Sequence, residues 1–89
     1  MMGKYTSQAI GGISADRTKK AADIIKKNGG QLKAAYALLG EADLLLIVDL
    51  PDTTAAVKVS ISLNKLTGIG FNTSPAMPVE EFDKLTVGL

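Results

Sequence analysis

The sequence lacks cysteine and histidine, two residue types that carry much of protein chemistry. Without cysteine the chain forms no disulfide bond and offers no thiolate to a metal or a substrate. Without histidine it has neither the most frequent general base near neutral pH nor the most frequent metal ligand. No serine or threonine therefore has a histidine to activate it, and we expect no metal site and no bound cofactor.

Long apolar segments and concentrated charge are also missing. No apolar run, Leu44 to Val48 included, approaches the roughly 18 residues that cross a bilayer, and the N-terminus lacks the apolar core of a signal peptide. Acidic and basic residues are interleaved at a net charge of +1, whereas nucleic-acid-binding domains usually carry a concentrated basic face. We expect a cytoplasmic protein with neither a membrane nor a nucleic acid as partner.

What is present is one small domain spanning residues 1–89. A chain of this length has a core that supplies only about 3–5 kcal/mol of net stability. Its apolar and charged fractions are ordinary for a folded protein. Without disulfide bonds or metals, such a chain often gains stability by association.

The first third of the sequence predicts a strand and a helix. Tyr5 to Ile10 has the composition of a short strand. Ser14 is a candidate N-cap, and Asp16 suits the first turn of a helix. That helix is expected to run to about Asn28, because Gly29-Gly30 follows.

A hairpin is predicted next. The first strand, Gln31 to Leu39, has Leu32 and Tyr36 on the same face if its side chains alternate without interruption. A short connection leads to the second strand, Leu44 to Leu50, so the two strands should pair antiparallel. Asp52 then has the position of a helix cap.

The segment from Thr53 to Thr67 fits two patterns. Val57 to Leu63 alternates as a strand does, whereas Ala55, Val59 and Leu63 share one face of a helix. The length of the segment without a turn signal exceeds that of most strands, so we predict a helix.

The last part of the chain predicts a strand and a short helix. Phe71 to Ala76 suits a strand, but Pro75 interrupts it, so this strand should lie at an edge of the sheet or end early. Pro78 is expected to begin a short helix.

This order of elements, β-α-β-β-α-β with a terminal helix, predicts an α+β fold of the ferredoxin-like type. Right-handed crossovers would place both long helices on one face of a four-stranded antiparallel sheet. The strand Leu44 to Leu50 is apolar on both faces up to Asp49, which is unusual when one face of a sheet meets water. Because soluble monomers avoid large exposed apolar patches, we expect a homodimer in which two copies pack sheet against sheet.

The middle of the chain resembles the GYD-domain family, small proteins of the dimeric α/β-barrel superfamily. The family's naming motif corresponds to Gly40-Glu41-Ala42-Asp43, with Ala42 in place of the tyrosine. The resemblance implies a dimeric α/β barrel and a helix over Thr53 to Thr67, and it implies little about function because the family has no established activity. The resemblance spans nearly the whole chain but is specific only across Gly29 to Ala56. It is also carried by Tyr36, by Pro51-Asp52, by Arg17 and by Glu80-Glu81.

The acidic pair Glu41 and Asp43 has two interpretations. The two carboxylates could bind a cation or act as acid and base. Alternatively, Asp43 accepts hydrogen bonds from the backbone of its own turn and Glu41 is solvated. Tyr36 could present its hydroxyl group to a pocket, or it could lie in the core with that group satisfied.

Four further polar residues are candidates for contact with a small anion: Lys4, Arg17, Lys33 and Asn72. The simpler interpretation is that the long basic side chains are solvated. Taken together, the ligand-binding candidates are Tyr36, Asp43, Asn72 and Arg17.

Three functions remain open from the sequence. The leading hypothesis is a homo-oligomeric small-molecule-binding or accessory protein that holds its ligand in a cleft. The alternative is a cofactor-independent enzyme, similar to monooxygenases or isomerases of the superfamily, that uses Tyr36, Asp43 or Asn72. A third hypothesis is a structural or regulatory partner of another protein, which uses the spare stripe of Val57 and Ile61 to build higher oligomers.

Overall fold

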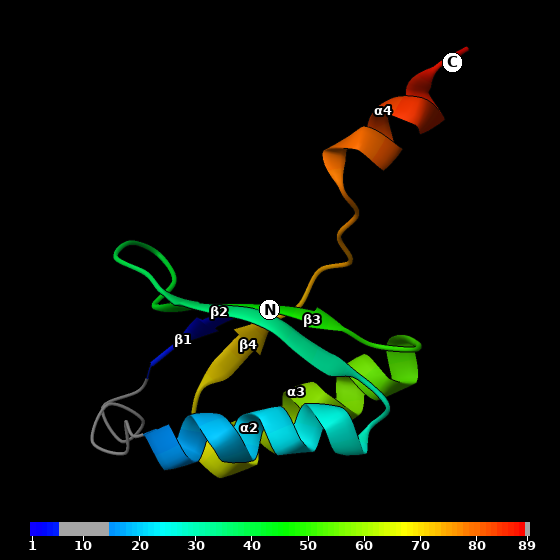
Figure 1. Cartoon of the computed structure of the whole chain (residues 1–89). Helices are drawn as coiled ribbons and strands as arrows, with labels where there is room; N and C mark the ends of the chain where they lie inside the picture. Colours follow the sequence, from blue (N-terminus) through cyan, green and yellow to red (C-terminus); the bar gives the residue numbers. More distant parts are fainter. Residues whose placement is uncertain (6–14, 89) are drawn as a thin grey trace.

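The computed structural model describes residues 1–5 and 15–88, and Figure 1 shows how their elements are arranged. Within those ranges the elements follow in the order strand, helix, strand, strand, helix, strand, helix. Their bounds are β1 Met2–Lys4, α2 Ala15–Lys27, β2 Gln31–Ala37, β3 Leu44–Asp49, α3 Thr53–Thr67, β4 Gly70–Asn72 and α4 Val79–Thr86.

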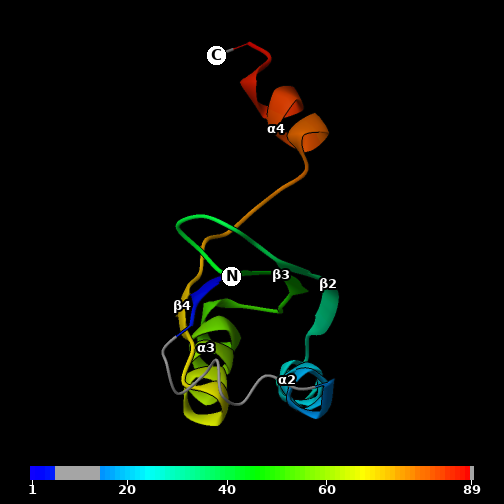
Figure 2. The same ribbon diagram turned by 90° about the vertical axis from the view of Figure 1, so that its left-hand side faces the viewer.

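The strands form one four-stranded antiparallel sheet in the order β2-β3-β1-β4. Helices α2 and α3 both lie beneath this sheet, and the two side views agree that its other face carries no helix of the described body (Figures 1 and 2). The predicted ferredoxin-like α+β fold is confirmed, as is the antiparallel hairpin of β2 and β3.

The core lies between the sheet and the two helices. Ile25 of α2 and Val59 and Leu63 of α3 are completely buried there, and Leu46 of β3 and Met1 join them. These positions follow from the helical spacing of apolar residues in α2 and α3, because residues three or four apart share one face. The sequence placed Ile25, Val59 and Leu63 on those faces.

Helix α3 has the bounds that the sequence predicts, and both of its ends carry a local stop signal. The carboxylate of Asp52 accepts a hydrogen bond from the N–H of Ala55 (2.7 Å), as an N-cap does. Gly68 has a left-handed backbone with φ of 74°, and its N–H donates to the carbonyl of Asn64. The strand interpretation of Val57 to Leu63 is therefore wrong.

The first strand lies earlier than predicted. The sequence placed it at Tyr5 to Ile10, whereas β1 is Met2–Lys4 and Tyr5 lies outside it. Because β1 is bonded on both sides, to β3 and to β4, sheet pairing outweighs the weak strand propensity of these residues. The remaining predicted positions, 6–10, and the predicted cap Ser14 lie outside the described residues.

An irregularity in β2 reverses part of the predicted alternation. Leu32 pairs with Val48, but Ala34 pairs with Ile47, so one extra residue, Lys33, lies between them. Such a bulge shifts the following side chains to the opposite face. The prediction that Leu32 and Tyr36 share a face is therefore wrong, since Leu32 packs on the core and Tyr36 does not.

The last strand is an edge strand and ends early, as Pro75 predicts. After Asn72 the chain leaves the body as an arm, which we define as residues 73–88 and which includes α4. Figures 1 and 2 show that the arm rises from the side of the sheet opposite to α2 and α3. The radius of gyration is accordingly 14.4 Å, above the roughly 12 Å that a compact chain of this length would have.

A close approach between β3 and the connection that joins α2 to β2 gives the first prediction. A Cβ atom added at Gly30 would overlap the carbonyl oxygen of Asp49, which cannot move aside. We expect Gly30→Ala to lower the free energy of unfolding by about 1–3 kcal/mol, measured by urea denaturation. The control is Gly70→Ala, whose added Cβ meets no atom within 4 Å and should change stability by less than about 0.5 kcal/mol. Equal midpoints for the two variants would contradict this packing.

Candidate functional site

The face of the sheet away from the helices carries a row of four side chains, one from each strand. Tyr36 lies opposite Leu45, Leu45 opposite Met2, and Met2 opposite Asn72. Strands lie about 4.8 Å apart, so Tyr36 and Asn72 stand roughly 14 Å from each other at the ends of this row.

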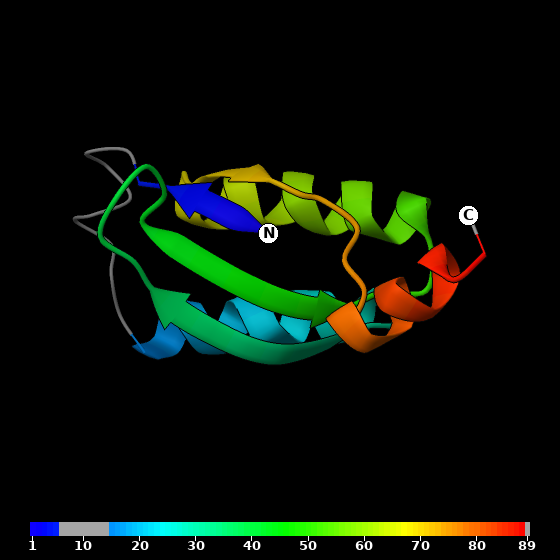
Figure 3. The same cartoon turned by 90° about the horizontal axis from the view of Figure 1, so that it is seen from above.

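This face, which we call the open face, consists of Met2, Ala34, Tyr36, Leu45, Ile47 and Asn72. Its centre is apolar and incompletely covered: Ile47 is 45% exposed and Met2 is 47% exposed. Figure 3 looks onto it and shows the arm passing near one end, while the connection between β2 and β3 rises on the same side of the sheet at the other end (Figure 1). Strand β3 therefore has apolar side chains on both faces, and only one face is covered within a single copy.

Asp43 has a structural role at the end of the hairpin. Its carboxylate accepts a hydrogen bond from the N–H of Tyr5 (2.9 Å), and its Oδ2 lies 3.6 Å from the Nζ of Lys4. The partner is thus the chain leaving β1, and not the backbone of its own turn as one interpretation predicted. Glu41 is exposed, as that interpretation held.

Arg17 lies on the opposite side of the sheet from Tyr36 and Asn72. Its guanidinium carbon is 6.0 Å from the centre of the Tyr5 ring, at the limit of a cation–π contact. Both side chains line a cavity of about 100 Å³ between sheet and helices. The buried Thr67 lines it as well, but its hydroxyl group donates to Leu63 and accepts from the N–H of Ile69.

A larger cavity, of about 660 Å³, lies beside the second half of β3, and we call it the notch. Pairing between β1 and β3 ends at Met1, whose amino group donates to the carbonyl of Leu46 and whose carbonyl accepts from the N–H of Leu46. Beyond that point no described strand pairs with this edge of β3. The notch is lined by Met1, residues 46–50 of β3 and the chain after it, Asp52, several residues of α3, Phe71 and residues 73–76.

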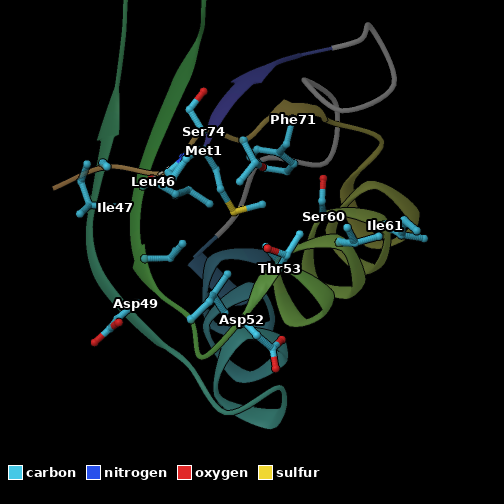
Figure 4. A pocket seen from close by; sticks show the side chains of 17 residues that line it. Met1, Leu46, Ile47, Asp49, Asp52, Thr53, Ser60, Ile61, Phe71 and Ser74 are labelled. Carbon is cyan, nitrogen blue, oxygen red and sulfur yellow. Dashed lines mark hydrogen bonds between the residues drawn. The ribbon is translucent and has the colours of Figure 1, made fainter.

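The walls of the notch are mostly apolar. Figure 4 shows the thioether of Met1 between β3 and α3, with Leu46 and Phe71 nearby and the carboxylates of Asp49 and Asp52 directed away. The polar groups on its walls include the hydroxyls of three residues: Thr53, Ser60 and Ser74.

Two backbone features add polarity to the notch. Alternate residues of a strand direct their N–H and C=O groups to the same edge, so Val48 presents these groups to the notch as Leu46 does to Met1. Burial also lowers the pKa of the Met1 amino group, because desolvation disfavours its charged form. Folding therefore favours the neutral amine. The contribution of this amino group to the free energy of unfolding increases as the pH rises from its pKa in the folded chain toward its pKa in the unfolded chain.

The four predicted site residues do not converge on one cavity. Tyr36 and Asn72 share the open face, Asp43 lies at the hairpin, and Arg17 lies beneath the sheet. Neither cavity described here is lined by Tyr36, Asp43 or Asn72. Lys4 pairs with Asp43, and Lys33 is exposed at the bulge.

The residues that line the notch were not among the predicted site residues. One signal did point to them, because Val57 and Ile61 form an apolar stripe of α3 that the core does not use, and both are 52% exposed. They form the outer part of the notch wall. The remaining lining comes from segments that are distant in sequence, for which no local pattern exists.

Two kinds of site can be assessed directly in the described residues. Within residues 1–5 and 15–88, no three acidic side chains gather in a group that could hold a metal ion. None of the helices in these ranges is both long enough and apolar enough to cross a bilayer.

The order of the elements, the order of the strands and the one-sided helix layer define a ferredoxin-like α+β protein. The family model for the GYD domain matches residues 1–86, so the chain belongs to the GYD-domain family. This confirms the resemblance that the sequence showed, which also spans nearly the whole chain. No curated protein and no solved structure matches the chain, and the family match carries no reaction or ligand with it.

The contacts of Asp43 give the second prediction. Asp43→Ala leaves the N–H of Tyr5 without its carboxylate partner, and we expect a loss of about 1.5 kcal/mol in the free energy of unfolding, measured with urea. Glu41→Ala, in the same turn but exposed, should stay within about 0.5 kcal/mol of the parent. A parent-like stability for Asp43→Ala would show that this carboxylate does not hold β1 to the hairpin.

Proposed function

We propose that the protein acts as a homodimer, formed by packing two open faces together, and binds a small, mostly apolar molecule in the notch. The role is that of a binding or accessory protein. The observation that carries the binding role is the notch itself, because its size falls within the range of small-molecule sites, about 300–1,000 Å³, and its walls combine apolar side chains with a few hydroxyl groups.

The dimer is supported by the apolar centre of the open face. Met2 of β1 lies opposite Leu45 of β3, and Ile47 follows Leu45 two residues later on the same face. In an isologous dimer, a twofold axis places the same surface of a second copy over this one, so no other residues are needed to cover it. Sheets that pack in this way lie about 10 Å apart and interdigitate their side chains.

Binding is favoured over catalysis by the positions of the polar groups. Asp43 is held by Tyr5 and Lys4, and Tyr36 and Arg17 lie on opposite sides of the sheet. A general acid and base must lie within hydrogen-bond reach of one substrate, and these candidates do not. The notch instead offers apolar contact with hydroxyl groups that can orient a ligand.

A charge placed on the open face tests the dimer. We expect the parent chain to sediment at twice its mass of 9.3 kDa at micromolar concentration. Ile47→Glu should raise the dimer dissociation constant about 100-fold, because it buries an unpaired carboxylate in the interface. Lys19→Glu, at an exposed position of α2, should leave the constant unchanged. A parent chain that stays monomeric at micromolar concentration would refute the dimer.

Filling the notch tests the binding role. N-phenylnaphthylamine is a neutral probe whose fluorescence rises in apolar surroundings, and we expect it to bind the parent chain saturably. Ala56→Phe places a ring into the notch and should reduce the probe's affinity at least tenfold. Thr54→Phe adds the same ring to the same helix outside the notch lining and should not. Parent-like binding by Ala56→Phe, with folding intact by circular dichroism, would remove the notch as the site.

A further inference from the structure

The C-terminal arm carries an amphipathic helix that packs on nothing described. No side chain of α4 is buried, and its apolar residues Val79, Phe82 and Leu85 are all exposed, Phe82 by 54%. Spacings of three residues place them on one side of the helix. An isolated helix of eight residues is unstable in water, since helices below about 12–15 residues are marginal. Helix α4 therefore needs a surface to pack against.

A matching surface exists on α3. Val57 and Ile61 form its exposed apolar stripe, each 52% exposed, at the outer wall of the notch. Amphipathic helices bind apolar surfaces of this kind through their own apolar residues, which are spaced three and four apart. The two stripes are therefore similar in kind and are both unpartnered in a single copy.

The charges of the two helices are complementary. Helix α3 contains Lys58 and Lys65 and no acidic residue, a net charge of +2. Helix α4 contains three acidic residues and Lys84, a net charge of −2. By helical spacing, Asp83 and Glu81 lie on either side of the apolar stripe of α4. Lys58 and Lys65 lie next to the apolar stripe of α3. Opposite charges that flank two apolar stripes favour their association and disfavour pairing of either helix with itself.

The direction of the arm determines which copy supplies α3. The arm rises from the side of the sheet opposite to its own α3 (Figures 1 and 2), which is the side that a second copy occupies in a dimer through the open faces. The partner's sheet would lie about 10 Å away. The six residues 73–78 can span up to about 20 Å when extended, so the arm can pass the partner's sheet and reach its helix layer.

We propose that α4 of one copy docks on the Val57 and Ile61 stripe of a second copy and closes the mouth of that copy's notch. The exchange is reciprocal, so each notch is completed by its partner's arm. This inference rests on the homodimer proposed above, but it does not depend on the ligand.

The absence of cysteine from the sequence allows a clean test by disulfide crosslinking. The full chain is prepared with Phe82→Cys, with Ile61→Cys and with both changes. Both positions are exposed in the single copy, so folding should tolerate the substitutions. The two single variants are unfolded together, refolded as a mixture, oxidised and run on a non-reducing gel. Sedimentation of the same samples before oxidation reports whether dimers have formed.

We expect the mixture to give a disulfide-linked dimer at least tenfold more abundant than in either variant alone. Phe82→Cys mixed with Lys19→Cys, an exposed position on α2, should give only background. A mixture that sediments as a dimer without crosslinking overturns the arm exchange and leaves the open-face dimer standing. Crosslinking only within one chain of the double variant means that the arm folds back on its own helix, which also overturns the exchange. A mixture that sediments as a monomer refutes both proposals.

Discussion

Strand β3 carries apolar side chains on both of its faces, and the structure depends on how each face is covered. Leu46 packs toward the helices and Ile47 points to the open face. On one edge β3 is paired along its length with β2, and on the other it is paired with β1 only as far as Met1. The core, the open face and the notch are the three results of this arrangement, since each is one side of the same strand.

Sequence reasoning succeeded where the determining signals are local. Helix α3 was predicted residue for residue because a capping aspartate, Asp52, and a left-handed glycine, Gly68, lie directly at its ends. An early end of β4 was also predicted, from Pro75, although the strand already ends at Asn72, opposite the first residue of β1.

It failed where the determinant is non-local. The position of β1 is set by its two neighbouring strands, and the side of the sheet occupied by Tyr36 is set by a bulge that leaves no mark in the composition of β2. The notch could not be predicted because its walls come together only after folding. Asp43 was predicted to bond the backbone of its own turn, but it accepts a hydrogen bond from the N–H of Tyr5, which directly follows β1 and is distant in sequence.

Electrostatics shows the same distinction between local pattern and folded arrangement. The net charge of +1 and the interleaving of signs along the sequence give no hint of a charged surface. In the folded chain the charges are sorted by element, with a basic α3 and an acidic α4. A nearly neutral protein can therefore carry opposite net charges on two of its helices.

The bulge at Lys33 has a consequence for the length that strand β2 can have. The residues on either side of Lys33 pair with Val48 and Ile47, which are adjacent, so Lys33 occupies no place of its own in the ladder. A chain without it would keep every cross-strand partner of β2, because the pairing already skips that position. Strand β2 is thus a place where a one-residue deletion is compatible with an unchanged core, whereas the same deletion in β3 would turn its apolar residues over from one face to the other.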